Sequence, residues 1–140
     1  MSHLTYCDYE GFGETARKNT HYNQAVRIGD MIECSGQGGW DRLTEQIPPS
    51  PGAQVDQAFA NVEYALKQAG GKGWSQVYKV RAYAAPLTEE IAEHLVRNLR
   101  QYCPDHMPLL TGVGVQGLAF GMCVEIEVVA HVGEGDKGGK

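Results

Sequence analysis

The sequence predicts a single α+β domain in which two helices pack on one face of a mixed β-sheet. Short stretches of alternating apolar and polar residues predict strands, and the clearest is CVEIEVVAHV at residues 123–132. There Val124, Ile126 and Val128 alternate with glutamates. Two longer stretches carry apolar residues at helical spacing. The length of 140 residues and the apolar fraction of 42% suit one domain with its own core.

The first half of the chain predicts a hairpin, a loop and a helix. Residues 24–36 contain two apolar stretches around Gly29 and Asp30, a pair typical of a two-residue hairpin turn because glycine accepts a positive φ. Residues 36–53 are rich in glycine, proline and polar side chains and predict a long loop, which at this length is usually mobile or functional. Residues 54–71 predict a helix that ends at two glycines.

The second half adds a strand, a helix and two closing strands. Residues 75–84 predict a strand, and residues 87–103 predict a helix with Thr88 as its N-cap. Residues 110–118 and 123–132 predict the last two strands. The predicted order is therefore β-β-α-β-α-β-β.

The second face of this sheet has no predicted helix to cover it. Four apolar side chains are expected there, which would form a large exposed patch: Val77, Tyr83, Val113 and Val115. We therefore expect self-association that closes sheet against sheet.

Composition narrows the class of protein. The net charge of −5 argues against a nucleic-acid partner, which would require a basic patch. No apolar run approaches 18 residues, so no membrane span is predicted. The N-terminus lacks the pattern of a signal peptide, so we expect a cytoplasmic protein and leave a mitochondrial location open. The four cysteines and five histidines show no metal-ligand spacing, and we expect no metal and no cofactor.

Several motifs together resemble the RidA family, also called YjgF/UK114 or L-PSP endoribonuclease-like. They are YNQAVRIGDMIECSGQ at residues 22–37, the helix ending LKQAGG, the strand VYKVRAY, and VEIEVVAHV. The resemblance covers residues 22–132, leaving residues 1–21 as an N-terminal segment and 133–140 as a flexible tail. It implies a chorismate-mutase-like fold and a homotrimer with pockets between subunits. Family members hydrolyse reactive enamines and imines, such as 2-aminoacrylate, to keto acids and ammonia.

The resemblance implies a role for each of the two acids in the last strand. By register Glu125 faces the pocket, where a partly shielded carboxyl with a raised pKa can activate water and deliver a proton to nitrogen. We expect Glu127 to be structural and to pair with Arg27, Lys79 or Arg81. The alternative is that both acids are solvated or held in ion pairs.

One departure from the family pattern concerns the substrate carboxylate. Family deaminases carry an arginine in a Pro-x-Arg-Ser/Thr segment, and this arginine clamps the carboxylate. Here Leu110 occupies that position and Gly112 replaces a cysteine that often follows. Arg42, in the long loop, is a candidate replacement cation, and Trp40 beside it is a candidate apolar wall; a solvated Arg42 is the alternative.

Three further residues are candidate pocket residues, and two of them, Tyr22 and Glu93, match family positions. Tyr22 lies near the pocket mouth, with interface packing as the alternative role. Gly36 would let the backbone approach a ligand closely, and Glu93 falls where many members place a polar residue. The N-terminal segment, which includes Tyr6, Tyr9 and Phe12, could cap a neighbour's pocket.

We therefore expect an enamine or imine deaminase whose small-molecule substrate is less anionic or more hydrophobic than the family's usual ones. The alternative is a non-catalytic trimeric protein that binds a small molecule in the same pockets. A ribonuclease, which the older family name suggests, is disfavoured by the net charge of −5.

Overall fold

The computed structural model describes residues 1–133. Of the predicted flexible tail, residues 133–140, all but the first residue lie outside this description. The helices are α1 (Phe12–Thr20), α2 (Pro51–Gln68) and α3 (Glu89–Tyr102), and single 3₁₀ turns span Trp74–Gln76 and Ala119–Gly121. The strands are β1 (Thr5–Cys7), β2 (Ala25–Ile28), β3 (Met31–Cys34), β4 (Gln37–Gly38), β5 (Val77–Ala84), β6 (Leu109–Gly114) and β7 (Val124–His131).

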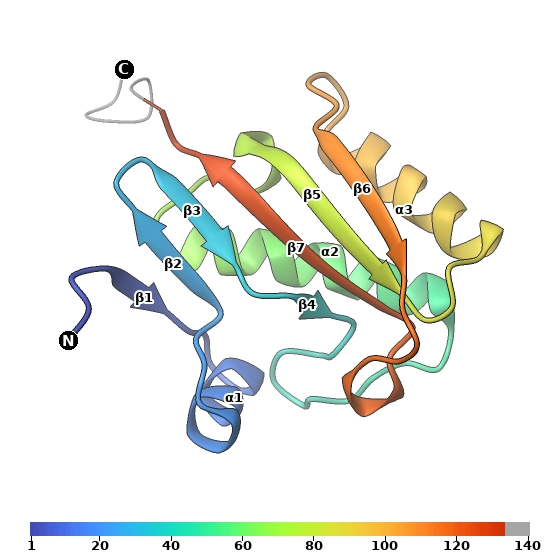
Figure 1. The fold of residues 1–140 in the computed structure, drawn as a ribbon, viewed down its shortest axis with the longest axis horizontal. Coiled ribbons are helices and arrows are strands. Elements are labelled where there is room, and N and C mark those ends of the chain that lie inside the picture. The colour runs from blue at the N-terminus through green and yellow to red at the C-terminus, as the bar shows by residue number, and fades with distance from the viewer. Residues whose placement is uncertain (134–140) are drawn as a thin grey trace.

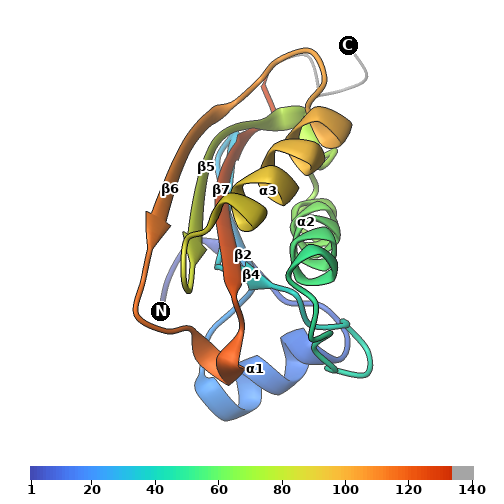
Figure 2. The same ribbon diagram turned by 90° about the vertical axis from the view of Figure 1, so that its right-hand side faces the viewer.

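The strands form one mixed sheet in the order β1-β2-β3-β7-β5-β6, and β4 also pairs with β7 (Figure 1). The β5–β6 pair is parallel, and the other pairs are antiparallel. Helices α2 and α3 lie on the same face of the sheet, and α1 lies at its end (Figure 2). The α+β class and the mixed sheet with two covering helices are therefore confirmed.

Local sequence rules account for the element ends. Gly29 has a φ of 59° in the β2–β3 hairpin, as the turn chemistry predicted. The hydroxyl of Thr88 accepts a hydrogen bond from the amide of Ile91 at 3.2 Å, which confirms the predicted cap of α3. Ser50 caps α2 in the same way through the amide of Ala53 at 3.1 Å.

The N-terminal segment is part of the domain, which the sequence did not predict. Strand β1 pairs with β2, and α1 adds a third helix to the two expected. Tyr9 and Phe12 are only 2% and 5% exposed in the core of their own chain. These two aromatic side chains therefore do not cap a neighbour's pocket.

The segment predicted as a long loop is partly regular, and its tryptophan is a core residue. Strand β4 lies in it, and Trp40 is 2% exposed. The Trp40 ring stacks on Phe12 at 3.7 Å between ring centres, and its Nε1 donates to the Tyr9 hydroxyl at 2.9 Å. Asn61 on α2 donates to the carbonyl of Trp40 at 2.8 Å. The prediction that Trp40 forms the wall of a ligand cleft is wrong, because aromatic residues of the N-terminal segment cover it.

A bulge changes which residues of β5 face away from the helices. Val77 pairs with Ala130, yet Lys79 pairs with Val129, so β5 carries an extra residue at this point. Val77 is consequently buried and 1% exposed, whereas Tyr78 is 42% exposed. The prediction that Val77 lies on the open face is therefore wrong, since period-two alternation fails at a bulge.

No helix within residues 1–133 combines the length and the apolar character that crossing a membrane requires.

Because Trp40 fills the junction between α1, β4 and α2, we expect Trp40→Ala to lower the free energy of unfolding by about 3–5 kcal/mol. Urea denaturation followed by circular dichroism measures this. Leu43→Ala is the matched control, since Leu43 lies in the same segment but is 66% exposed and should cost well under 1 kcal/mol. An unchanged midpoint for Trp40→Ala would contradict the core role of Trp40.

Candidate functional site

The open face of the sheet carries the acids of β7. Val124, Ile126 and Val128 are buried on the side of α2, so the pleat turns Glu125 and Glu127 to the opposite side. No helix covers that side anywhere in the described chain (Figure 2). The open face is therefore where side chains of the sheet can meet a ligand or another subunit.

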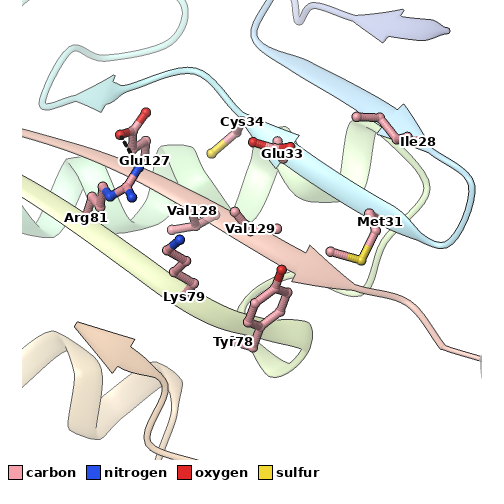
Figure 3. Close-up of a pocket in the computed structure, with 10 residues that line it drawn as sticks. All are labelled: Ile28, Met31, Glu33, Cys34, Tyr78, Lys79, Arg81, Glu127, Val128 and Val129. Atoms are coloured by element: carbon pink, nitrogen blue, oxygen red, sulfur yellow. Dashed lines mark ion pairs between the residues drawn. The ribbon is translucent and has the colours of Figure 1, made fainter. Parts of the chain in front are cut away.

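Glu127 is tied to its neighbours on β5. The Tyr83 hydroxyl donates a hydrogen bond to the carboxylate of Glu127, and this bond is the main reason why the pKa of Tyr83 is raised. Arg81, opposite Glu127 in the register, places Nη1 3.9 Å from Oε1 of the same carboxylate (Figure 3). The predicted structural pairing of Glu127 is confirmed, and Arg81 is its partner.

Glu125 has a different environment. It is half-buried, and burial is the larger cause that raises the pKa of its carboxyl above the ordinary value of 4.5, with the charge of Glu127 as the smaller cause. The carboxylate lies directly against Gly36, where any Cβ would collide with Oε1. Glycine at this position therefore makes room for the Glu125 carboxylate, whereas the sequence suggested room for a ligand.

Tyr22 lies close to this carboxyl. Its side chain is 37% exposed, and burial raises the pKa of its phenol; the nearby side chain of Gln24 opposes this rise and the charge of Glu125 adds to it. The structure thus brings together three of the predicted pocket residues, Tyr22, Gly36 and Glu125, on the open face of one chain.

Two hollows lie on this face. One, of about 390 Å³, lies between β3, β7 and β5 (Figure 3), and its polar lining includes Glu33, Lys79, Arg81 and Glu127. The other, of about 430 Å³, lies beside Tyr22. Sequence reasoning did not assign Glu33 to a site; its place between buried Ile32 and Cys34 was the available signal.

Cys34 also borders both hollows but is not a candidate nucleophile. It is 5% exposed, and burial raises the pKa of its thiol to about 12. The thiol therefore stays protonated near neutral pH.

The other predicted pocket residues lie elsewhere in the chain. Leu110 pairs with buried Val80, so its side chain turns toward the helices and lines an apolar groove of about 440 Å³ beside α3. Gly112 has the same parity along β6, and Glu93 is exposed on α3. A single chain therefore does not bring Leu110 or Glu93 to Glu125.

The Arg42 side chain packs against helix α2. Its guanidinium lies 4.1 Å from the centre of the Tyr64 ring and donates to Asn61 Oδ1 at 3.3 Å. It lies on the helix side of the sheet and not beside Glu125. The expectation that Arg42 replaces the missing arginine is therefore not met within one chain, because Tyr64 and Asn61 hold it elsewhere.

Among residues 1–133 no three His, Cys, Asp or Glu side chains are grouped so that they could hold a metal ion. The chemistry available on the open face is that of carboxyl, phenol and amide groups, together with the ammonium of Lys79 and the guanidinium of Arg81.

A model of the family described as Endoribonuclease L-PSP matches residues 14–132. The chain belongs to this family, which is the RidA/YjgF family. It is 30% identical over 112 residues to a Dermatophagoides farinae protein named 2-iminobutanoate/2-iminopropanoate deaminase, covering 79% of this chain and 85% of that one.

Solved structures of the family share the fold. The chain superposes on RidA from an Antarctic Psychrobacter species with a TM-score of 0.74 and 26% identity, covering 91% of this chain and 94% of that one. It superposes on a structure named Protein YJGH with a TM-score of 0.81 and 27% identity, covering 95% and 99% of the two chains. The family match begins within α1, so part of the predicted N-terminal segment belongs to it.

The raised pKa of Glu125 predicts a pH-dependent effect on stability. A carboxyl whose pKa is higher in the folded state stabilises the fold when protonated, and this contribution is lost as the pH rises through the folded-state pKa. We therefore expect Glu125→Gln to be more stable than the wild type at pH 8 and to lose this advantage near pH 4. Urea unfolding at both pH values measures it.

Glu10→Gln is the control, because Glu10 is exposed and the difference between the two pH values should be small. A Glu125→Gln variant that gains stability only in acid would mean that the carboxylate is stabilised by the fold.

Proposed function

We propose that this protein is an enamine or imine deaminase, a hydrolase whose substrate is less anionic or more hydrophobic than a short imino acid. The observation that carries the proposal is Glu125: a half-buried carboxyl with a raised pKa, held against Gly36 and beside Tyr22. The name of the Dermatophagoides farinae relative supports this reaction class.

The chemistry requires one group that moves protons both ways. Water adds to the carbon of the C=N bond, and Glu125 accepts the proton that the water loses. The same carboxyl returns this proton to the nitrogen, which gives a neutral tetrahedral adduct with a hydroxyl and an amino group. The hydroxyl proton then passes through Glu125 to the amino nitrogen, the C–N bond breaks as the C=O bond forms, and a carbonyl compound and ammonia leave. A carboxyl with a raised pKa suits this exchange better than a fully solvated one, since both protonation states are then accessible nearer neutral pH.

The pocket would be completed by a second chain. Tyr22, Gly36 and Glu125 lie on the open face, whereas Leu110 and Glu93 lie toward α3, so one chain holds only part of the predicted pocket. A homotrimer, which the family resemblance implies, would cover the open face and bring the two groups together from neighbouring subunits.

Leu110 sets the proposed specificity. It is 44% exposed on β6 at the family's arginine position, and it lines the apolar groove beside α3. An aliphatic side chain cannot clamp a carboxylate, so a substrate with an apolar group at this position would fit better. Leucine at this position is equally compatible with the second candidate function, a trimeric protein that binds a small molecule without turning it over.

The first test is the oligomeric state. We expect sedimentation velocity at micromolar concentration to give a mass three times that of the 15.3 kDa chain. The physical reason is the uncovered sheet face, which self-association would remove from water. A stable monomer would contradict the inter-subunit pocket.

The second test is ammonia release from 2-aminoacrylate generated in situ. We expect slow turnover by the wild type, a rise in Leu110→Arg, and loss of activity in Glu125→Gln. Restoring a charge-assisted contact is worth about 2–5 kcal/mol, or roughly 30- to 5,000-fold in affinity for the carboxylate.

Leu43→Arg is the control, because Leu43 is 66% exposed and lines neither the two hollows of the open face nor the groove beside α3. A gain in both variants would reflect charge alone. Fast wild-type turnover would contradict the proposed specificity. No gain in a folded Leu110→Arg trimer would favour the binding protein.

A further inference from the structure

Four buried side chains are joined by hydrogen bonds in a series that ends at Gln24, next to Tyr22. Trp40 Nε1 donates to the Tyr9 hydroxyl at 2.9 Å, and that hydroxyl donates to Gln37 Oε1 at 2.7 Å. Gln37 Nε2 donates to Gln24 Oε1 at 2.8 Å. All four residues are at most 2% exposed, so bulk water does not compete for these bonds.

The direction of this series follows from the chemistry of its first member. An indole N–H can only donate, so the Tyr9 hydroxyl accepts from Trp40 and has its own proton left to donate. The Gln37 NH₂ group also donates to the backbone carbonyl of Ser35 at 3.2 Å, so the Gln37 oxygen is the atom that faces Tyr9. This leaves the Gln37 NH₂ group to face Gln24. The carbonyl oxygen of Gln24 therefore points at Gln37, and its NH₂ group points the other way.

That NH₂ group is an unused donor. Gln24 is 0% exposed, and its Nε2 has no hydrogen-bond partner within the described chain. Buried donors are almost always paired, so an unpaired one next to a proposed site calls for a partner. The Tyr22 phenol lies close enough for the Gln24 side chain to lower its pKa, and Tyr22 is 37% exposed.

We propose that Gln24 is a positioning residue of the site: its Nε2–H donates to the hydroxyl oxygen of Tyr22 and turns the Tyr22 proton toward the bound ligand. With its oxygen accepting from Gln24, Tyr22 becomes a donor of fixed direction. Such a donor binds the nitrogen of a C=N group or the oxygen of a carbonyl, which are the acceptors that an imine and its product present. This last step rests on the proposed deaminase function; the Gln24–Tyr22 bond does not.

The other ionisable groups around Tyr22 are few. Glu125 faces it from β7, and the buried phenol of Tyr9 lies on its inner side. Tyr6, His21, Glu33 and Cys34 share the hollow beside it. A titration of Tyr22 therefore reports on Gln24 when these groups are left unchanged.

The test uses the full chain labelled with ¹³C at the tyrosine Cζ position, with the Tyr22 signal assigned by its loss in Tyr22→Phe. A donor to the phenol oxygen stabilises the phenolate, so we expect Gln24→Met to raise the pKa of Tyr22. Gln24→Glu should raise it further, because it puts an acceptor and a negative charge where the donor stood. The Gln24→Glu side chain also keeps an oxygen that accepts from Gln37, so this variant provides the test if Gln24→Met does not fold.

Gln54→Met is the matched control. Gln54 is 5% exposed, and its amide donates to the carbonyl of Pro48 and accepts from the amide of Cys123, outside the series that ends at Gln24. We expect the pKa of Tyr22 to be unchanged in this variant. An unchanged Tyr22 pKa in both folded Gln24 variants would overturn the inference, as would an equal shift in Gln54→Met.

Ammonia release separates this inference from the proposed function. If the wild type deaminates 2-aminoacrylate or a more hydrophobic imine, Gln24→Met should lower kcat about two- to tenfold, the effect of one hydrogen bond. A wild type without deaminase activity would contradict the proposed function, while the tyrosine titration would still decide the role of Gln24.

Discussion

Strand β7 lies between β5 on one side and β3 and β4 on the other, and its pleat sorts the residues of the whole domain. Val124, Ile126 and Val128 are at most 2% exposed against the helices, so the apolar core fixes the orientation of the strand. Because successive side chains of a strand point to opposite faces, Glu125 and Glu127 face the open side. A shift of one residue would bury both carboxylates, which is far too costly for the fold to tolerate.

The two acids differ because their neighbours differ. Glu127 accepts a hydrogen bond from the phenol of Tyr83 and forms an ion pair with the guanidinium of Arg81, both on β5. Glu125 meets the backbone at Gly36 and the phenol of Tyr22, and within the described residues it makes no ion pair. One carboxylate is therefore structural, and the other retains the capacity to take up and release a proton.

The N-terminal aromatic residues connect this site to the core. Phe12 stacks on Trp40, and Trp40 holds the hydroxyl of Tyr9, from which the buried amides of Gln37 and Gln24 take their direction. The same aromatic residues therefore pack the core and help to orient the buried amides. Trp40 and Tyr9 thereby contribute to the direction in which the Gln24 amide points.

The sequence by itself determined the class of the fold, the order of the main strands and helices, the cap at Thr88, the hairpin at Gly29 and the orientation of Glu125 and Glu127. These features depend on local backbone preferences and on periodic burial, which a short stretch of residues contains. The tertiary structure alone decided that Trp40 is buried and that Arg42 packs on Tyr64. It also decided that a bulge buries Val77 and leaves Tyr78 on the open face. Leu110 and Glu125 lie on opposite sides of the sheet for the same kind of reason. Each of these depends on a contact or a strand register between residues far apart in the chain, and no local pattern carries that information.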